Sequence, residues 1–272
     1  MVRSLWTGAT GMNAQQTNVD TIANNLANVN TTGYKAQESE FKSLLYQSLQ
    51  TKTTTANGDP VPVTSQVGLG TRNSSINSIF TQGNMIASES STAFAIEGKG
   101  FFSVKGEDDE TFYTRNGDFT WAMNGSNGVV LTNSDGLPVL DQKGQRITFN
   151  SSYMTSKLTI TSDGTVCYPD SDGNPQSTGK TIGLSQFQNP AGLERKGDSL
   201  YKATAASGKA INEATSDKVE KSKIASGYLE GSNVQVANEM VNLIVAQRAY
   251  EMNSKVITTT DTMMDEANNL KR

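Results

Sequence analysis

Apolar residues recur at seven-residue intervals near both ends of the chain. The stripe near the N-terminus consists of Leu5, Met12, Val19 and Leu26. The stripe near the C-terminus consists of Val236, Leu243, Tyr250, Ile257 and Met264, flanked by Met240 and Ile244. An apolar repeat sustained over several heptads is typical of long helices that pack on other helices. The pattern therefore predicts one helix over residues 3–29 and another from about residue 233 to about residue 270.

Neither stripe has enough chain beside it to be covered locally. The expected partners are the other terminus and other copies of the molecule, so the pattern indicates a polymer subunit. We expect subunit contacts along both stripes and at Ile22. The first segment also contains Gly8 and Gly11 and many asparagines, which are poor helix formers. It should therefore need tertiary or quaternary packing to become helical.

Four asparagines, Asn24, Asn25, Asn28 and Asn30, lie close together at the end of this first segment. They could form the solvated side of a fraying helix, or they could make hydrogen bonds to other subunits. The second interpretation is favoured, because so dense a cluster of poor helix formers is costly without a purpose.

The ends of the two helices carry recognisable signals. The turn from Asn30 to Gly33 ends the first helix, with Gly33 suited to a left-handed conformation. Tyr34 and Lys35 follow, and they either mark the helix end or form a junction between helical and β layers. Ser232, with Gln235 three residues later, predicts a capping box at the start of the last helix.

Between the helices the sequence indicates β-structure. Over residues 71–232, short apolar runs alternate with Asn-Gly and Asp-Gly pairs, which are hairpin signals. No long helical pattern interrupts them, so we expect an antiparallel β domain inserted between the terminal helices, residues 1–30 and 233–272, in an α+β fold.

Residues 31–70 are expected to form a junction segment with an extended arm. Early in this segment four apolar residues share one helical face, namely Phe41, Leu44, Leu45 and Leu49. Residues 51–65 are rich in Thr and contain Asn57 followed by Gly, then Pro60 and Pro62. Such residues favour an extended or flexible excursion over a strand in a closed sheet.

Composition narrows the functional classes. The chain has 272 residues, with 23 basic and 27 acidic residues, a net charge of −4 and no histidine. No basic run suggests binding to DNA or RNA, and no stretch of 18 apolar residues suggests a membrane span. The first residues lack the apolar core of a cleavable signal peptide, so we expect any export to leave the N-terminus intact.

Few residues of the chain suggest catalysis or the binding of a ligand or metal. Cys167 is the only cysteine, so no disulfide can form within the chain. A phosphate-loop reading of residues 173–181 fails on its glycine spacing. A calcium-loop reading from Asp170 fails because Pro175 replaces the required glycine and Thr181 replaces the closing carboxylate. The acidic run 108–110 is better explained as a solvated hairpin tip. We therefore expect no catalytic residue, no cofactor, no metal and no enzymatic activity.

Two longer motifs resemble a known family. Residues 22–35, from Ile22 through the Asn-rich turn to Lys35, and residues 230–255, from Glu230 to Lys255, closely resemble the N- and C-terminal signatures of bacterial flagellar rod and hook proteins. The intervening motifs at residues 82–84, 96–102 and 113–119 are also similar to this family. The resemblance covers nearly the whole chain.

The resemblance implies assembly into a hollow helical tube that crosses the periplasm and carries torque to the hook. It also implies export by the flagellar type III apparatus and contacts with proximal rod proteins, the hook protein and the periplasmic and outer-membrane rings. The length and the segment from residue 46 to residue 71 resemble the distal rod. Tyr46, Asn57, Pro60 and Pro62 then belong to an arm between protofilaments. The alternatives are another rod protein, a short hook protein or a peptidoglycan-interacting periplasmic module.

Overall fold

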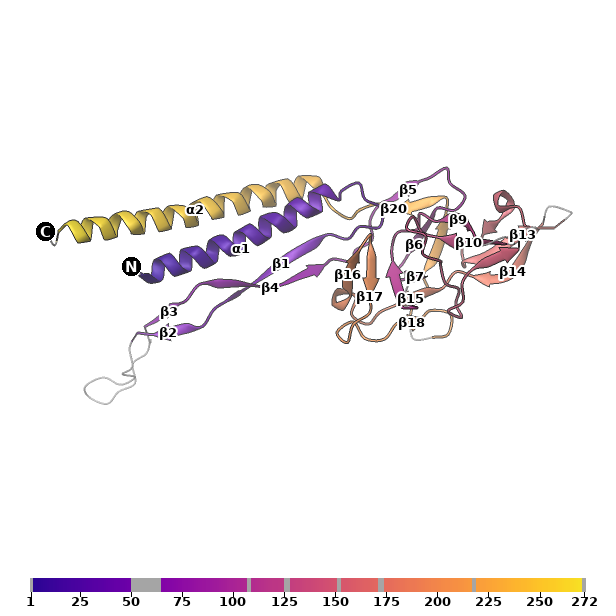
Figure 1. Cartoon of the computed structure of the whole chain (residues 1–272), viewed down its shortest axis with the longest axis horizontal. Coiled ribbons are helices and arrows are strands. Elements are labelled where there is room, and N and C mark those ends of the chain that lie inside the picture. The colour runs from indigo at the N-terminus through magenta and orange to yellow at the C-terminus, as the bar shows by residue number, and fades with distance from the viewer. Residues whose placement is uncertain are drawn as a thin grey trace. The chain divides into compact units, whose positions relative to one another are not determined.

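The computed structural model describes residues 2–49, 65–106, 109–124, 128–150, 153–170, 174–216 and 219–270. The chain is an α+β protein with two long helices and many antiparallel strands (Figure 1). It divides into two compact units. Unit 1 comprises residues 1–27, 37–78 and 235–272, and unit 2 comprises residues 28–36 and 79–234. The chain therefore crosses between the units after residues 27, 36, 78 and 234.

Unit 1 contains both helices and a long β-hairpin. Helix α1 (Val2–Ala27) packs beside helix α2 (Val236–Asn269) and also against the hairpin (Figure 1). The hairpin pairs β1 (Gln37–Ser43) with β4 (Thr71–Ser78), and β2 (Tyr46–Ser48) with β3 (Gln66–Gly68). The helix predicted over residues 3–29 thus ends two residues earlier, because residues 28–30 form a turn.

Two local predictions were wrong. The segment around Phe41, whose apolar spacing predicts a helical face, instead forms β1 and β2. Phe41 lies in β1 and pairs with Asn73 of β4. The capping box of Ser232 and Gln235 is absent. Helix α2 begins at Val236, and Gln235 is its N-cap, in an extended conformation without a side-chain capping bond. Ser232 Oγ instead accepts a hydrogen bond of 3.3 Å from the Val234 backbone N–H, outside the helix.

Unit 2 is a β body in which the strand pairs of the described residues are all antiparallel. Its largest sheet has the order β16 (Glu194–Gly197), β17 (Leu200–Lys202), β8 (Thr111–Thr114), β7 (Phe101–Lys105), β15 (Leu184–Gln186), β18 (Ile211–Asn212). Two three-stranded sheets have the orders β11 (Thr148–Asn150), β10 (Gly128–Thr132), β9 (Thr120–Met123) and β12 (Thr159–Ile160), β13 (Thr165–Pro169), β14 (Pro175–Thr181).

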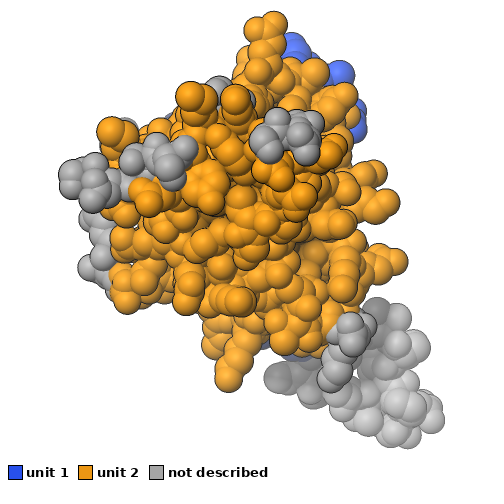
Figure 2. Space-filling view, turned by 90° about the vertical axis from the view of Figure 1, so that its right-hand side faces the viewer, with its two compact units in different colours: residues 1–27, 37–78, 235–272 blue, residues 28–36, 79–234 orange. Residues whose placement is uncertain are grey.

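Two smaller strand pairs complete unit 2. They are β19 (Lys223–Ser226) with β6 (Phe94–Glu97), and β20 (Tyr228–Glu230) with β5 (Met85–Ala87). Single 3-10 turns lie at Thr155–Lys157 and Pro190–Gly192. In the space-filling view the described residues of unit 2 make up most of the face that is turned to the viewer (Figure 2).

The main apolar core lies in unit 2. Its centre is formed by fully buried side chains of several sheets, among them Phe94, Phe102, Phe119, Leu131 and Ile182. A second cluster surrounds Phe101, Tyr113 and Tyr201. Cys167 is buried in β13 and is free. Within the described residues, neither helix carries an apolar stretch long enough to cross a membrane.

Candidate functional site

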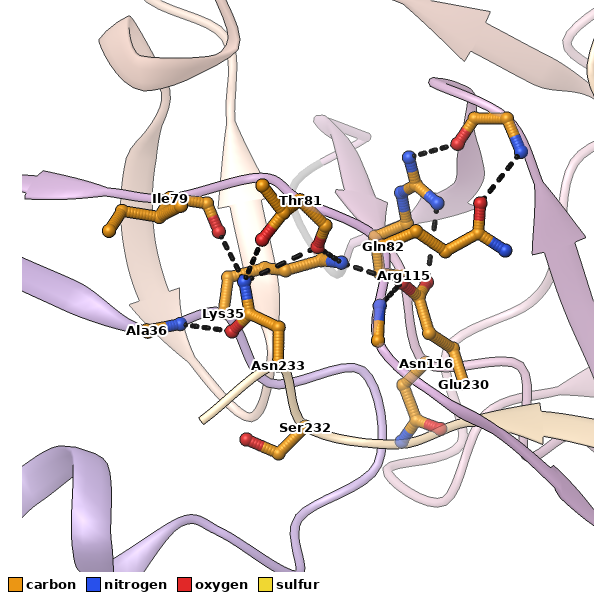
Figure 3. Close-up of polar contacts among 12 residues, drawn as sticks. Lys35, Ala36, Ile79, Thr81, Gln82, Arg115, Asn116, Glu230, Ser232 and Asn233 are labelled. Carbon is orange, nitrogen blue, oxygen red and sulfur yellow. Dashed lines mark hydrogen bonds and ion pairs between the residues drawn. The ribbon is translucent and has the colours of Figure 1, made fainter. Parts of the chain in front are cut away.

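Unit 2 contains a buried cluster of three charged side chains, Lys35, Arg115 and Glu230 (Figure 3). Lys35 lies in the segment 28–36, Arg115 follows β8, and Glu230 is the last residue of β20. The Lys35 ammonium lies 2.6 Å from Glu230 Oε1, and Arg115 Nη1 lies 3.2 Å from Glu230 Oε2. The side chains of Lys35 and Glu230 are 0% exposed. One carboxylate therefore serves two cations without access to solvent.

Backbone groups supply further partners to this cluster. The Lys35 ammonium donates a hydrogen bond of 2.7 Å to the Thr81 carbonyl, and Arg115 Nη2 donates one of 2.6 Å to the Gly98 carbonyl. The Gly83 N–H donates to Glu230 Oε1 at 3.0 Å. Burial lowers the pKa of Lys35, and the adjacent Glu230 carboxylate opposes that shift. Burial likewise lowers the pKa of Arg115, again against the effect of Glu230.

A second set of hydrogen bonds joins the residues at which the chain leaves unit 2. The Ala36 N–H donates to Asn233 Oδ1 at 2.7 Å, and Asn233 Nδ2 donates to the Ile79 carbonyl at 2.8 Å (Figure 3). The Ile79 N–H donates to the Ala36 carbonyl at 2.8 Å, which closes the set. These residues lie beside three of the four crossings between the units. Asn233 thus holds three separate chain segments at one place.

The predicted junction residues fall within this region of unit 2. Gly33 has a φ of +68°, and an added Cβ would lie 2.5 Å from the Asn116 backbone nitrogen, so glycine is required there. Tyr34 is buried and stacks under the Arg195 guanidinium, whose central carbon lies 4.9 Å from the ring centroid. Arg195 also donates to the Lys35 carbonyl. Asn30 is exposed.

Sequence reasoning did not find the partners of Lys35. Arg115 and Glu230 both lie in motifs that resemble the flagellar family, but motif membership does not reveal which residues pair. The available signal was the presence of charged residues within short runs of glycine and apolar residues. Buried charges of this kind require an opposite charge nearby. We call this buried cluster of Lys35, Arg115 and Glu230 in unit 2 the ion-pair lock.

In unit 1 the two helices approach closely through small residues of α1. A Cβ added at Gly8 would lie 3.0 Å from Ile257 Cγ1, and one at Gly11 would lie 2.8 Å from Asn253 Nδ2. The hydroxyls of Ser4 and Thr260 are 3.3 Å apart. Because early residues of α1 lie beside late residues of α2, the helices run antiparallel. The glycines that weaken α1 as an isolated helix are therefore needed for helix packing.

The asparagines near the end of α1, and Asn28 directly after it, make bonds within the chain. Asn25 is 1% exposed, and its amide both donates to the Gln37 carbonyl and accepts from the Gln37 N–H, each at 2.8 Å. Asn24 donates to Gln37 Oε1 at 3.1 Å, and Asn28 accepts from the Thr31 hydroxyl at 3.1 Å. The buried amide of Asn25 thus caps the first strand of the hairpin, and contacts of these asparagines with other subunits remain a prediction.

The stripe residues lie on α1 and α2 as predicted, with unequal burial. Ile22 is buried, and seven stripe residues are half-buried, namely Leu5, Met12, Val19, Leu26, Leu243, Ile257 and Met264. Four others are exposed, namely Val236, Met240, Ile244 and Tyr250. Their contacts with other subunits remain a prediction.

The predicted arm is described only at its base. Tyr46 opens β2, pairs with Gly68 of β3 and is 63% exposed. Asn57, Pro60 and Pro62 lie outside the described residues.

Sequence comparisons place these features among known proteins. Residues 5–35 match the family described as "Flagella basal body rod protein", residues 95–168 match "Flagellar hook protein FlgE/F/G D1 domain", and residues 225–270 match "Flagellar basal body rod FlgEFG protein C-terminal". The chain is also similar along its whole length to proteins named "Flagellar basal-body rod protein FlgG". It is 44% identical over 274 residues to that of Borreliella burgdorferi and 35% identical over 278 residues to that of Bacillus subtilis, with 100% of each chain covered. With that of Agrobacterium fabrum it shares 40% identity over 264 residues, which cover 96% of this chain and 97% of the relative.

Proposed function

This chain belongs to the family of flagellar basal-body rod proteins named FlgG, and we propose that it polymerises into the distal rod as a hollow helical shaft. As a member of this family it is a structural subunit of the basal-body rod. In our proposal the shaft crosses the periplasm and transmits torque to the hook.

The observation that carries the proposal is the incomplete burial of the terminal helices. Leu5, Met12, Val19 and Leu26 remain half-buried after α1 has packed on both α2 and the hairpin. Apolar stripes at heptad spacing are stabilised when further helices cover them. We therefore propose that α1 and α2 of successive copies form a coiled-coil layer whose sequence is discontinuous.

The ion-pair lock supports a mechanical role for the junction. A subunit that transmits torque needs chain segments that stay in place where they leave unit 2. The lock around Glu230 and the hydrogen bonds of Asn233 hold these exits with buried, charge-assisted contacts, which are stronger than neutral ones. We assign Gly33, Tyr34 and Lys35 to this junction on that basis.

Partners and location follow from the same family membership. We propose export by the flagellar type III apparatus without a cleaved signal peptide. Contacts in the periplasm would then be made with proximal rod proteins, the hook protein and the surrounding rings.

Replacement of Leu26 or Leu243 by Glu tests the proposed assembly. A charge introduced at a position that neighbouring helices enclose costs several kcal/mol, so we expect no rods in cells that lack their own copy. Asn13→Glu is the matched control, because Asn13 is exposed on α1 outside the stripe. Electron microscopy of isolated basal bodies and a swimming assay give the readout. Normal rods with Leu26→Glu and Leu243→Glu would show that the stripes are not packed interfaces.

A further inference from the structure

Unit 2 is closed by a segment that comes from near the end of the chain. Residues 223–234 contain β19 and β20 and include the last residue of the unit. Strand β19 pairs with β6, and β20 pairs with β5. We call residues 223–234 the clasp. It makes three kinds of contact in unit 2, and each of them completes a buried part of the unit.

The first contact completes a strand of the apolar core. Phe94 and Ile96 of β6 are 0% exposed and belong to the main core of unit 2. Among the described strands, β19 is the only one that pairs with β6. A backbone N–H or C=O group that is buried without a partner costs free energy comparable to a lost hydrogen bond. Strand β6 is therefore costly to bury before β19 pairs with it.

The second contact fills the same core. Ile224 of β19 is 3% exposed and is a member of the main core cluster. Its backbone N–H donates a hydrogen bond of 2.9 Å to the Ser162 carbonyl, in the turn between β12 and β13. Removal of a buried aliphatic side chain leaves a cavity and takes contacts from the side chains around it. Without the clasp, the core of unit 2 is thus incomplete at this place.

The third contact neutralises two buried cations. Glu230, at the end of β20, is the counter-charge of both Lys35 and Arg115 (Figure 3). The Glu230 backbone carbonyl also accepts a hydrogen bond of 2.8 Å from the Gly33 N–H. Loss of one partner from a buried ion pair is strongly destabilising, because an uncompensated buried charge remains. The segment 28–36 is therefore held in unit 2 only when the clasp is in place.

We propose that the clasp controls when unit 2 folds, so that the unit stays open until residues 223–234 dock. N-terminal domains generally fold first as a chain emerges during synthesis. Unit 2 instead needs the segments 28–36 and 223–234, which lie near opposite ends of the chain. The consequence for export rests on the proposed function. A partly exported chain cannot form the ion-pair lock, so unit 2 closes only where nearly the whole chain has been released.

The folding kinetics of the full chain test this order of events. Refolding and unfolding are followed in a stopped-flow instrument by the fluorescence of Trp121 in a Trp6→Phe background, in which only unit 2 contains tryptophan. Ile224→Val removes one carbon from the clasp. If unit 2 folds only as the clasp docks, this variant should fold more slowly by a factor of about 2 to 12, while its unfolding rate stays unchanged.

Ile147→Val is the matched control. Ile147 is also fully buried in the main core of unit 2, but it lies outside the clasp. Each substitution lowers the free energy of unfolding by some amount, and this loss is divided between slower folding and faster unfolding. We expect slower folding to account for a larger share of the loss in Ile224→Val than in Ile147→Val.

Glu230→Gln gives a second measurement when the effect of Ile224→Val is too small to divide between the two rates. It removes the counter-charge supplied by the clasp, and it should also slow folding. Variants that fold at the unsubstituted rate and only unfold faster would show that the clasp docks last, onto a finished unit, which would overturn the inference. A chain in which folding waits for the clasp but which builds no rods would support the inference and contradict the proposed function.

Discussion

At the scale of single residues, Glu230 links two buried cations within unit 2. Its carboxylate is the acidic partner of both Lys35 and Arg115, and all three side chains are at most 2% exposed. The sequence identified Lys35 as a junction residue through its position after the Asn-rich turn. It could not identify Glu230 as the partner, because the two residues are 195 positions apart and only the folded chain brings them together.

Replacement of Glu230 by Gln should destabilise unit 2 by about 3–5 kcal/mol, because it leaves buried cations without their counter-charge. The free energy of unfolding is measured by urea denaturation in a Trp6→Phe background, with the fluorescence of Trp121 as the signal. Glu194→Gln is the control. Its ion pair with Lys196 is exposed on both sides and should contribute less than about 1 kcal/mol. Equal effects of the two substitutions would show that the cluster does not stabilise the unit.

At the scale of elements, the heptad pattern located both helices to within a few residues. It did so because long apolar periodicity is a local signal. The hairpin was not predicted, because β1 forms only by pairing with β4. The local pattern around Phe41 carries no information about that distant partner. The capping box failed because Asn233 beside it is engaged by Ala36 and Ile79, which holds residues 232–234 in unit 2.

Substitution of Gly8 by Leu should prevent close packing of α1 on α2. An added Cβ already meets Ile257 at 3.0 Å, and overfilling such a contact typically costs about 1–3 kcal/mol. We expect a loss of helical circular dichroism at lower urea concentration. Asn13→Leu adds the same side chain at an exposed position of α1 and should leave this transition unchanged. A transition unaltered by Gly8→Leu would mean that the helices are not held at this distance.

Deletion of residues 46–67 should leave a polymer that forms but bends. The sequence predicts that this arm links neighbouring protofilaments, and its loss would let them slide. The deletion is conservative for unit 1, because the Leu69 N–H donates to the Leu45 carbonyl at 3.2 Å and the cut ends lie side by side. Electron microscopy of the rods measures their curvature. Straight rods like those of the intact chain would refute the assignment of the arm.

At the scale of the whole molecule, the two units differ in how far their apolar side chains are buried within one copy. Unit 2 has its own apolar core and ion-pair lock. Unit 1 leaves the apolar stripe of α1 half-buried and four residues of the α2 stripe exposed. The sequence could predict that other copies cover the helices. It could not show which residues of the α2 stripe stay exposed, because only the contact with α1 shows which side of α2 remains open.

Unassembled protein should therefore unfold in two steps. Helical circular dichroism reports on unit 1, which contains both α-helices, and the fluorescence of Trp121 in a Trp6→Phe variant reports on unit 2. We expect the helical signal to be lost first and to shift to higher urea concentration after assembly, because polymerisation stabilises the state that it binds. Coincident transitions before assembly would argue against this difference between the units.

The most direct measurement is electron cryomicroscopy of rods built from the full chain, at a resolution that separates the helices. The account predicts a tube in which α1 and α2 of successive copies pack together, with the stripe that contains Met12 and Val19 covered by helices of neighbouring copies. A polymer held together only by contacts between copies of unit 2, with this stripe still uncovered, would contradict it.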